Sequence, residues 1–358
     1  MRQAGLFGLS EHLKRLSAHG DPLEELGRII DFEAFRPVLV AALAYGDGAK
    51  GGRPPYDPVA MLKVLVLAAQ NNVADARMEY LIRDRLSWLR FLGFDLGAST
   101  PDANTIRLFR EKLTESGALD AVFADFDRQL KERGYLAMGG QIVDATLVAA
   151  PKQRNTMPEK DAIKAGKSAS EIWPDKPARA AQKDTDARWM LKFAKAKPLA
   201  NGKPGIDIAI PSFGYKSSVS ICRTFGFIRK GKVTDAARFD GRMLRDVVTS
   251  DNTASDVWAD TAYRSQANEA WLKRQGRVSR IHRKKPRGTP MPERTARANA
   301  AKSKVRARVE HVFARQKDQM GLFIRTIGIK RAEAKITLAN LAYNMNRLIF
   351  HERRVAKG

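Results

Sequence analysis

The chain has little of what most metal-binding, disulfide-linked or membrane proteins require. It contains a single cysteine, Cys222, so no disulfide framework and no cysteine zinc site can form within 358 residues. Its five histidines are scattered, and no two stand at the spacing of a zinc-protease motif. No apolar run approaches the roughly 20 residues that a membrane-spanning helix needs. The N-terminus shows no signal-peptide pattern. We therefore expect no membrane segment and a cytoplasmic protein.

Acidic residues are too few to balance the basic ones. The chain has 39 Asp and Glu against 64 Lys and Arg, a formal net charge of +25. Residues 1–135 hold 18 basic and 19 acidic residues, so the whole surplus lies after them. Residues 277–308 contain twelve basic residues and one acidic residue, Glu293. Such a one-sided stretch favours phosphate contacts with double-stranded DNA over a merely solvated surface, and hence association with the nucleoid.

The first part of the chain has the pattern of several short helices. Apolar residues recur at helical spacing in 58–71, 74–83 and 87–94. Residues 99–102 (Ser-Thr-Pro-Asp) predict a helix start, with a capping hydroxyl, a proline in the first turn and an early acid. A helix-turn-helix-like DNA module and a plain helical packing domain both fit this pattern. We expect an all-α N-terminal domain over 1–135 that binds DNA or supports assembly.

The pattern changes at Gly139-Gly140 to alternating strands and helices. Residues 151–204 lack a clean period and are interpreted as a basic insertion or mobile loop in a second domain over 136–358. The order of the remaining elements, three strands, helix, strand, helix, strand, helix, is that of a ribonuclease H-like α/β fold with a mixed sheet. The expected strands are 141–148, 216–222, 226–233, 256–260 and 277–283, and the expected helices are 240–250, 265–275, 297–319 and 332–351.

Three acids stand where acids are disfavoured. Asp144 interrupts an apolar strand, Asp260 ends another, and Glu310 lies in a strongly basic helix. Each one alone is more simply a strand-end cap or part of a surface ion pair. Together, on the first strand, the fourth strand and the last helix of this fold, they predict a site for Mg²⁺, which prefers carboxylate oxygens. Two such ions can activate a nucleophile and stabilise the leaving oxygen at a phosphodiester.

The helix around Glu310 adds two cations at helical spacing. Arg306 precedes Glu310 by four residues and Lys317 follows it by seven, which places all three on one face of a regular helix. An apolar stripe beside that face would pack on the sheet, formed by Val305, Val309 and Val312. We expect a metal-binding carboxylate flanked by two phosphate-binding cations. Simple charge support between Arg306 and Glu310 is the alternative.

This spacing resembles the R-E-K part of the Y-R-E-K signature of DDE transposases from bacterial insertion sequences, in the group typified by insertion sequence number five. The tyrosine of that signature falls at Ser303. The likeness covers most of the chain except about 151–180. It is also carried by the segments 56–110, 142–146, 213–216, 259–263 and 338–348.

The resemblance implies a transposase that binds terminal inverted repeats, cleaves transposon ends and joins the freed 3′-hydroxyl to target DNA. Asp144, Asp260 and Glu310 would hold two Mg²⁺ or Mn²⁺ ions, and Arg306 and Lys317 would orient phosphates. A homodimer or higher oligomer would hold two ends together. The rival readings are a ribonuclease H-like structure-specific nuclease and a catalytically impaired, transposase-derived DNA-binding protein. Further candidate DNA contacts are Lys284, Lys285, Arg287 and Arg308.

One aromatic residue of the insertion, Trp189, offers a flat face for an extruded base. Stacking on an aromatic side chain is worth on the order of 1–3 kcal/mol per base, and Arg188 beside it suits a phosphate. The simpler interpretation is that Trp189 anchors the insertion on the domain, because large aromatic side chains are mostly buried.

Overall fold

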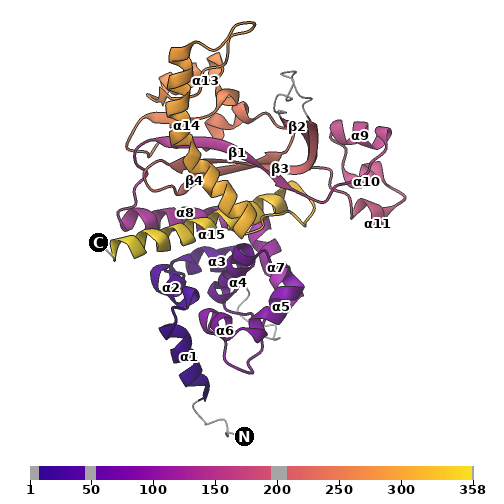
Figure 1. The fold of residues 1–358 in the computed structure, drawn as a ribbon. Coiled ribbons are helices and arrows are strands. Elements are labelled where there is room, and N and C mark those ends of the chain that lie inside the picture. Colours follow the sequence, from indigo (N-terminus) through magenta and orange to yellow (C-terminus); the bar gives the residue numbers. More distant parts are fainter. Residues whose placement is uncertain (1–7, 45–53, 195–207, 357–358) are drawn as a thin grey trace, which may run out of the picture. The chain divides into compact units, whose positions relative to one another are not determined.

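The computed structural model describes residues 8–44, 54–194 and 208–356 (Figure 1), which form two compact units. The first unit comprises Met1–Leu136, Asp318–Gly321 and Thr337–Gly358, and the second comprises Ala137–Lys317 and Leu322–Ile336. The last helix, which the sequence assigned wholly to the second domain, therefore joins the first unit from Thr337 onward. Long-range polar contacts hold it there. Tyr135 donates to Glu352 Oε1 at 2.8 Å, and Arg353 pairs with Glu25.

The first unit is helical, as expected, and is built around its most apolar helix. Ten residues of α4 (Pro58–Asn71) are buried. Its other helices up to residue 136 are α1 (Gly8–Ala18), α2 (Pro22–Ile29), η1 (Glu33–Phe35), α3 (Arg36–Leu43), α5 (Asp75–Asp84), α6 (Leu86–Leu92), α7 (Ala103–Glu115) and α8 (Ala118–Glu132).

The start of α7 differs from the sequence expectation. Asp102, not a hydroxyl residue, is the N-cap, and its carboxylate accepts from the Thr105 backbone N–H at 2.6 Å. The Thr100 hydroxyl instead accepts from Arg83 Nε at 2.9 Å. Because the carboxylate caps the helix, Pro101 precedes the first turn rather than lying in it.

The second unit contains a six-stranded mixed sheet of the ribonuclease H-like kind. Its main path runs β2–β3–β1–β5–β6, and β4 pairs with β3. The β1–β3, β2–β3 and β3–β4 pairs are antiparallel, whereas β1–β5 and β5–β6 are parallel. The strands are β1 (Gln141–Ala149), β2 (Arg188–Ala194), β3 (Ile208–Cys222), β4 (Ile228–Asp235), β5 (Asp256–Trp258) and β6 (Val278–Ser279).

Helices connect the strands of this sheet and follow the last one. The sequence expected a long regular helix to residue 319, but the last turn is π-helical, in η4 (Arg315–Gln319). The others are α9 (Met157–Lys164), α10 (Ala169–Ile172), α11 (Pro177–Ala180), η2 (Asp240–Met243), α12 (Leu244–Val247), η3 (Thr261–Tyr263), α13 (Gln266–Arg274), α14 (Glu293–Ala314) and α15 (Ile329–Val355). None of the helices in the described ranges is apolar and long enough to span a membrane.

The two faces of β1 have different neighbours, because side chains alternate along a strand. Val143 belongs to a buried cluster that includes Leu244 of α12 and Leu272 of α13. Asp144 points to the opposite face, where Arg306 of α14 reaches it. Val309 and Val312 of α14 are fully buried, so this helix packs by the apolar stripe that the sequence predicted.

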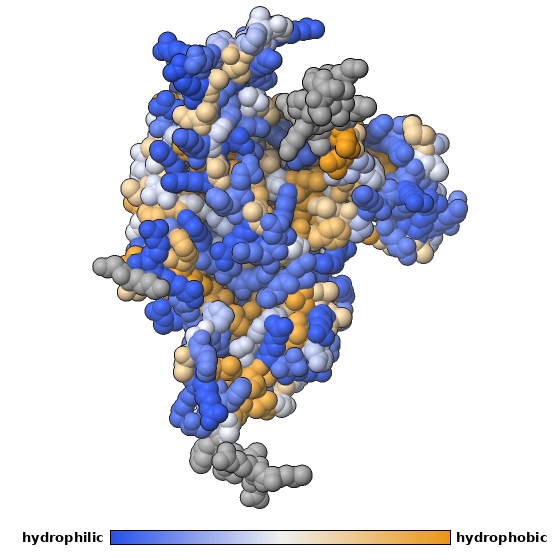
Figure 2. Space-filling view, in the orientation of Figure 1, coloured by the Kyte–Doolittle hydropathy of each residue, from blue (hydrophilic) through white to orange (hydrophobic). Residues whose placement is uncertain are grey.

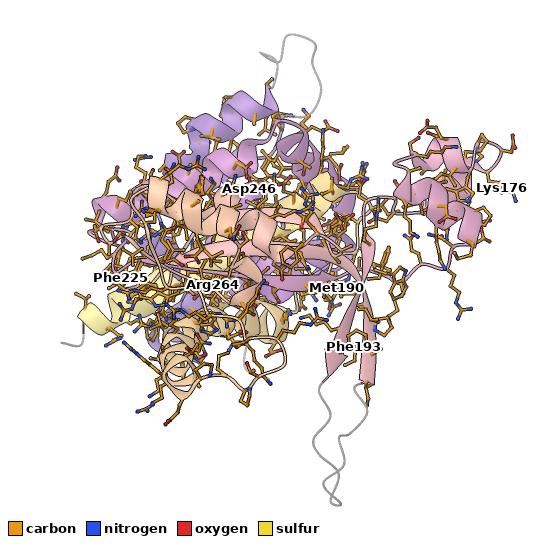
Figure 3. All side chains as sticks on the ribbon, turned by 90° about the horizontal axis from the view of Figure 1, so that it is seen from above. Lys176, Met190, Phe193, Phe225, Asp246 and Arg264 are labelled. Carbon is orange, nitrogen blue, oxygen red and sulfur yellow. The ribbon has the colours of Figure 1, made fainter. Side chains whose placement is uncertain are left out.

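The segment 151–204 is not a structureless loop over its described part. It folds into α9, α10, α11 and β2, and residues 195–207 lie outside the described ranges. Capping boxes begin two of its helices, with Thr156 and Glu159 at α9 and Ser168 and Glu171 at α10. Buried Trp173 donates to Glu159 Oε1 at 2.8 Å. Figure 3 shows this helical lobe at Lys176 and the ribbon of β2 and β3 at Met190 and Phe193.

Candidate active site

Asp144 is buried near the middle of β1, opposite Val219 of β3. Its Oδ1 accepts from the backbone N–H of Ala145 at 2.9 Å, and its Oδ2 accepts from Arg306 Nη2 at 2.8 Å. Burial raises the pKa of this carboxyl above its ordinary value, although the nearby Arg306 guanidinium lowers it. Asp144 is thus a buried carboxyl group whose negative charge is stabilised by a neighbouring cation.

Asp260 comes close to Asp144 through the pairing of two parallel strands. Ile142 of β1 lies opposite Trp258 of β5, and each acid follows its partner residue by two positions. The two acids therefore extend on the same face at the same end of neighbouring strands. Asp260 caps η3, with Oδ1 accepting from the Ala262 N–H at 2.8 Å. Its negative charge adds to the rise in the pKa of Asp144.

Glu310 meets Asp144 through one guanidinium group. Arg306 Nη2, which binds Asp144, also lies 3.4 Å from Glu310 Oε1, one helical turn along α14. The negative charges of Asp144, Asp260 and Glu310 all raise the pKa of Arg306, although its burial lowers it. The three acids therefore surround Arg306. Within the described residues, no three or more His, Cys, Asp or Glu side chains are grouped closely enough to hold a metal ion.

The remaining basic candidates are exposed. Unlike Arg306, they have no recorded contact with the three acids among the described residues. Lys284, Lys285 and Arg287 lie on the loop between β6 and α14. Arg308 donates to the backbone carbonyl of Arg223. Lys317 lies in the π-helical η4, so its spacing of seven from Glu310 no longer implies a shared face of a regular helix.

Ser303, at the position of the signature tyrosine, is also exposed. Its Oγ lies 3.5 Å from Nε2 of His282. This contact joins α14, the helix that carries both Ser303 and Glu310, to the segment that follows β6.

Two protein-family models match the chain. The model described as Transposase domain (DUF772) matches residues 10–112, and the model described as Transposase DDE domain matches residues 136–345. The chain belongs to the DDE transposases. It is of the kind typified by insertion sequences number four and five, so it is an enzyme of transposition with DNA as substrate, in a family that uses divalent metal ions. No solved structure matches it.

In this transposase Trp189 lies on β2 and is 42% exposed, so it is not buried in the domain. Its ring is tilted against that of Phe213 on β3, with centroids 5.3 Å apart. Both rings line a pocket of about 630 Å³ together with Ile163, Lys160 and Lys164 of α9. Arg188 does not present a free guanidinium there, because it donates to the carbonyls of Thr185, Ala187 and Ile163.

Sequence reasoning gave no role to Lys216, Asp240 or Tyr263, although Lys216 and Tyr263 lie in segments that carry the family resemblance. Buried Lys216 places Nζ 2.7 Å from Asp240 Oδ1 and donates to the Arg238 carbonyl at 2.6 Å. Tyr263 follows Asp260 by three positions and is fully buried. A lysine within an otherwise apolar and hydroxyl-bearing strand was the available signal for Lys216. The role of Asp240 depends on a long-range contact that the sequence does not reveal.

Proposed function

We propose that this transposase binds terminal inverted repeats, cleaves transposon ends and joins the 3′-hydroxyl to target DNA, with Asp144, Asp260 and Glu310 as its catalytic acids. The observation that carries the proposal is the position of Arg306. One guanidinium contacts Asp144 and Glu310 and interacts with the charge of Asp260. A divalent cation could take the place of the guanidinium that these acids share.

The donor set fits Mg²⁺ or Mn²⁺. All three side chains offer carboxylate oxygens, which these hard ions prefer. Burial raises the pKa of Asp144, so a positive charge beside it favours its ionised form. We propose that Asp144, Asp260 and Glu310 hold two such ions after Arg306 turns away from them. When bound, the ions supply an activated water or hydroxyl and stabilise the leaving oxygen.

The residues around the acids would bind and orient DNA. Arg306, once released from Asp144, has a planar guanidinium suited to a phosphate, and Lys317 supplies a second positive charge in the π-helical turn that follows α14. Both would hold the phosphodiester against the acids and stabilise the charge that develops on it. In this proposal only the side chain of Arg306 changes position, and α14 stays in place.

The exposed basic loop before α14 would contact the DNA backbone. Lys284, Lys285 and Arg287 lie on it, and Arg308 follows on the helix. The residues of this loop and of α14 are mostly hydrophilic in Figure 2. Three exposed cations close in sequence, with Arg308 as a fourth on the helix, are suited to phosphates rather than to base edges. They would position DNA without reading its sequence.

Trp189 is proposed to stack on a base that leaves the helix at the cut. Its partial exposure, the neighbouring Phe213 ring and the pocket beneath them support this role. Lys160 and Lys164, rather than the engaged Arg188, would then face the phosphate of that nucleotide.

Two transposon ends must be held together for joining, so we propose a homodimer or higher oligomer on DNA, at the nucleoid. A first unit without a basic surplus would support that assembly at least as well as DNA binding. In this proposal the first unit supports assembly, and the second unit carries the catalytic acids and most of the DNA contacts.

Cleavage of DNA carrying the transposon end tests the catalytic acids. We expect the purified transposase to cut it only when Mg²⁺ or Mn²⁺ is present. Asp144→Asn, Asp260→Asn and Glu310→Gln should each abolish cleavage while they retain binding to uncut end DNA. The amide side chains keep the size of the acids but lose the charge that a metal ion needs.

Asp256→Asn is the matched control. Asp256 is a strand acid of β5 that pairs with Arg280 at 2.6 Å, away from Arg306. This variant should cleave as the unmodified protein does. Cleavage by any of the three acid variants would remove that acid from the proposed site. An unmodified protein that binds end DNA but never cuts it would instead support a non-catalytic DNA-binding protein.

A further inference from the structure

His282 lies in line with Asp144 and Asp260, on a third neighbouring strand. Its backbone N–H donates to the carbonyl of Ala259 at 3.1 Å, so the parallel pairing of β5 with β6 continues past the end of β6. This bond brings His282 opposite Asp260, just as the pairing of β1 with β5 brings Asp144 opposite Asp260. The three residues form one row across the sheet, which we call the acid–histidine row.

The side chains of the acid–histidine row point to the same face of the sheet. The residue before each of them belongs to one buried apolar cluster, which includes Val143, Ala259 and Ile281. Because side chains alternate along a strand, Asp144, Asp260 and His282 point away from that cluster. Contacts with α14 agree with this direction. Nε2 of His282 lies 3.5 Å from Oγ of Ser303, and Arg306 of the same helix donates to Asp144.

One side of α14 carries the groups that face this row. Ser303, Arg306 and Glu310 stand three and seven residues apart in a regular helix, so they share a side. Ser303 is exposed. A phosphate that reaches the guanidinium of Arg306 can therefore also reach this hydroxyl and the imidazole nitrogen beside it.

The ring of His282 is not needed to hold its segment against α14, because the adjacent residues do so. The Asn299 side chain accepts from the Arg283 N–H and donates to the Arg283 carbonyl, both at 3.0 Å. Lys302 donates to the carbonyl of Ile281 at 3.0 Å. By contrast, the 3.5 Å contact of His282 is at the outer limit of a hydrogen bond. It leaves both atoms able to bond to a third group.

The charge state of His282 suits a donor rather than a counter-ion. Burial lowers its pKa below the ordinary value, and the positive charges of Arg306 and Lys302 lower it further, although Asp260 raises it. The ring is therefore neutral at pH 7 and donates from one nitrogen only. It adds a hydrogen bond donor beside Arg306 without adding another positive charge.

We propose that His282 is a further DNA-contacting residue of the active site, whose Nε2–H donates, together with the hydroxyl of Ser303, to the oxygens of one backbone phosphate beside Arg306. The inference rests on the proposed function, because it takes the acids as the place where DNA is cut. Ser303 stands at the position of the signature tyrosine, and His282 supplies a polar ring next to that shorter side chain.

Cleavage of transposon-end DNA with Mg²⁺ by the full chain tests the contact. His282→Leu keeps the bulk of the ring but loses the donor, so kcat/KM should fall on the order of 10- to 100-fold, the usual worth of a hydrogen bond to a charged group. His282→Gln, which retains an N–H donor, should recover most of that loss. Both variants should melt close to the unmodified protein, because Asn299 and Lys302 still hold the segment.

End DNA with single methylphosphonates locates the contact. This change removes the charged oxygen of one phosphate, and we expect the unmodified protein to lose activity at a few positions near the cut. At one of them His282→Leu should lose nothing further, because the oxygen that it would have contacted is already gone. Asn299→Ala is the structural control. It should melt at a lower temperature, and its loss should add to that of the modified DNA at every position.

The outcomes separate this contact from the proposed function. If Asp144→Asn is inactive but His282→Leu cleaves normally, the contact is wrong and the catalytic acids stand. The contact is also wrong if Leu and Gln at position 282 lower activity and melting temperature equally, or if the loss in His282→Leu adds to every methylphosphonate. If Asp144→Asn cleaves DNA, the acids are wrongly assigned and the contact of His282 fails with them.

Discussion

Arg306 is the side chain on which the electrostatics of the candidate active site depend. Its guanidinium binds the buried Asp144 and the exposed Glu310, and it also interacts with Asp260. A cation so placed neutralises acids that would otherwise repel one another. It also competes with any metal ion for the same oxygens. Arg306 therefore stabilises the metal-free protein and opposes the metal-bound one.

Replacing this arginine should make folding depend on metal. Arg306→Met leaves Asp144 buried and unpaired, so we expect it to lower the free energy of unfolding by about 1–3 kcal/mol, between the values for exposed and buried ion pairs. Mn²⁺ should then raise the melting temperature of the variant more than that of the unmodified protein, because the ion has no guanidinium to displace. Calorimetric melting with and without Mn²⁺ measures both effects.

Arg280→Met is the control for that experiment. Arg280 pairs with Asp256 at 2.6 Å, but its side chain is 51% exposed, so its removal should cost less than 1 kcal/mol by the usual worth of a surface pair, roughly 0–1 kcal/mol. It should also give no extra response to Mn²⁺. An Arg306 variant that behaves like the Arg280 variant would show that the acids do not depend on Arg306.

At the scale of elements, the pairing of β1 with β3 places Asp144. The register runs without a shift from Gln141 opposite Cys222 to Ala149 opposite Gly214. Gly214 permits that close pairing, because a Cβ there would lie 2.2 Å from the carbonyl oxygen of Val148. Its φ of 151° is also a backbone conformation that other residues rarely adopt.

A methyl group at this glycine should disturb the strand that carries the acid. Gly214→Ala forces β3 away from β1, and we expect it to lower the free energy of unfolding by about 1–3 kcal/mol or more, as overpacked sites do. Denaturant unfolding measures the loss. Gly27→Ala in α2, where the nearest atom to a Cβ is 3.7 Å away, should be neutral or stabilising. Equal stability of the two variants would show that the pairing of β1 and β3 can accommodate a methyl group at Gly214.

The elements also show which parts of the fold the sequence could predict. The strand that carries Asp144 and the strand that ends two residues before Asp260 are short apolar runs, and their local pattern was sufficient to predict them, although the expected strand 256–260 ends at Trp258. The pattern of α9 was less visible because its residues are small and charged, yet its capping box of Thr156 and Glu159 is a local signal that predicts a helix start. In β2 the alternation of Trp189, Leu191 and Phe193 was a strand signal of the same kind.

Other features could not be predicted, because they depend on contacts far apart in the chain. The sequence placed Arg306 four residues from Glu310, but the bond from Arg306 to Asp144 spans 162 positions. The π-helical turn at Lys317 changes a direction that regular helical spacing seemed to fix. The end of α15 is held in the first unit by contacts of Glu352 with Tyr135 and of Arg353 with Glu25. Each pair is more than 200 positions apart in the sequence. The hydrogen bonds by which Asn268 ties η3 to η2 likewise appear only in the folded chain.

At the scale of the whole molecule, positive charge is concentrated in the part of the chain that forms most of the second unit. Residues 1–135 are close to neutral, and the rest of the chain carries the whole basic surplus of the protein. DNA binding that relies on phosphate contacts should therefore depend on the second unit. Its salt dependence reports how many phosphates the protein neutralises.

Removing charge from the basic loop should flatten that salt dependence. Changing Lys284, Lys285 and Arg287 together to Gln should reduce the slope of log affinity against log salt by about 2–3, since each phosphate contact contributes roughly 0.9. Fluorescence anisotropy over a salt series measures the slope. The same change at Lys14, Arg15 and Arg28, three exposed cations of the first unit, removes equal charge and should leave the slope unaltered. Equal slopes for the two triple variants would make the loop a solubilising surface only.

The most direct test of the metal site is a crystal structure with Mn²⁺, in which anomalous scattering locates the ions. We expect anomalous peaks roughly 2.0–2.3 Å from carboxylate oxygens of Asp144, Asp260 and Glu310, with Arg306 no longer bonded to Asp144. Peaks elsewhere on the protein, or Arg306 still between acids that bind no ion at saturating Mn²⁺, would contradict the account.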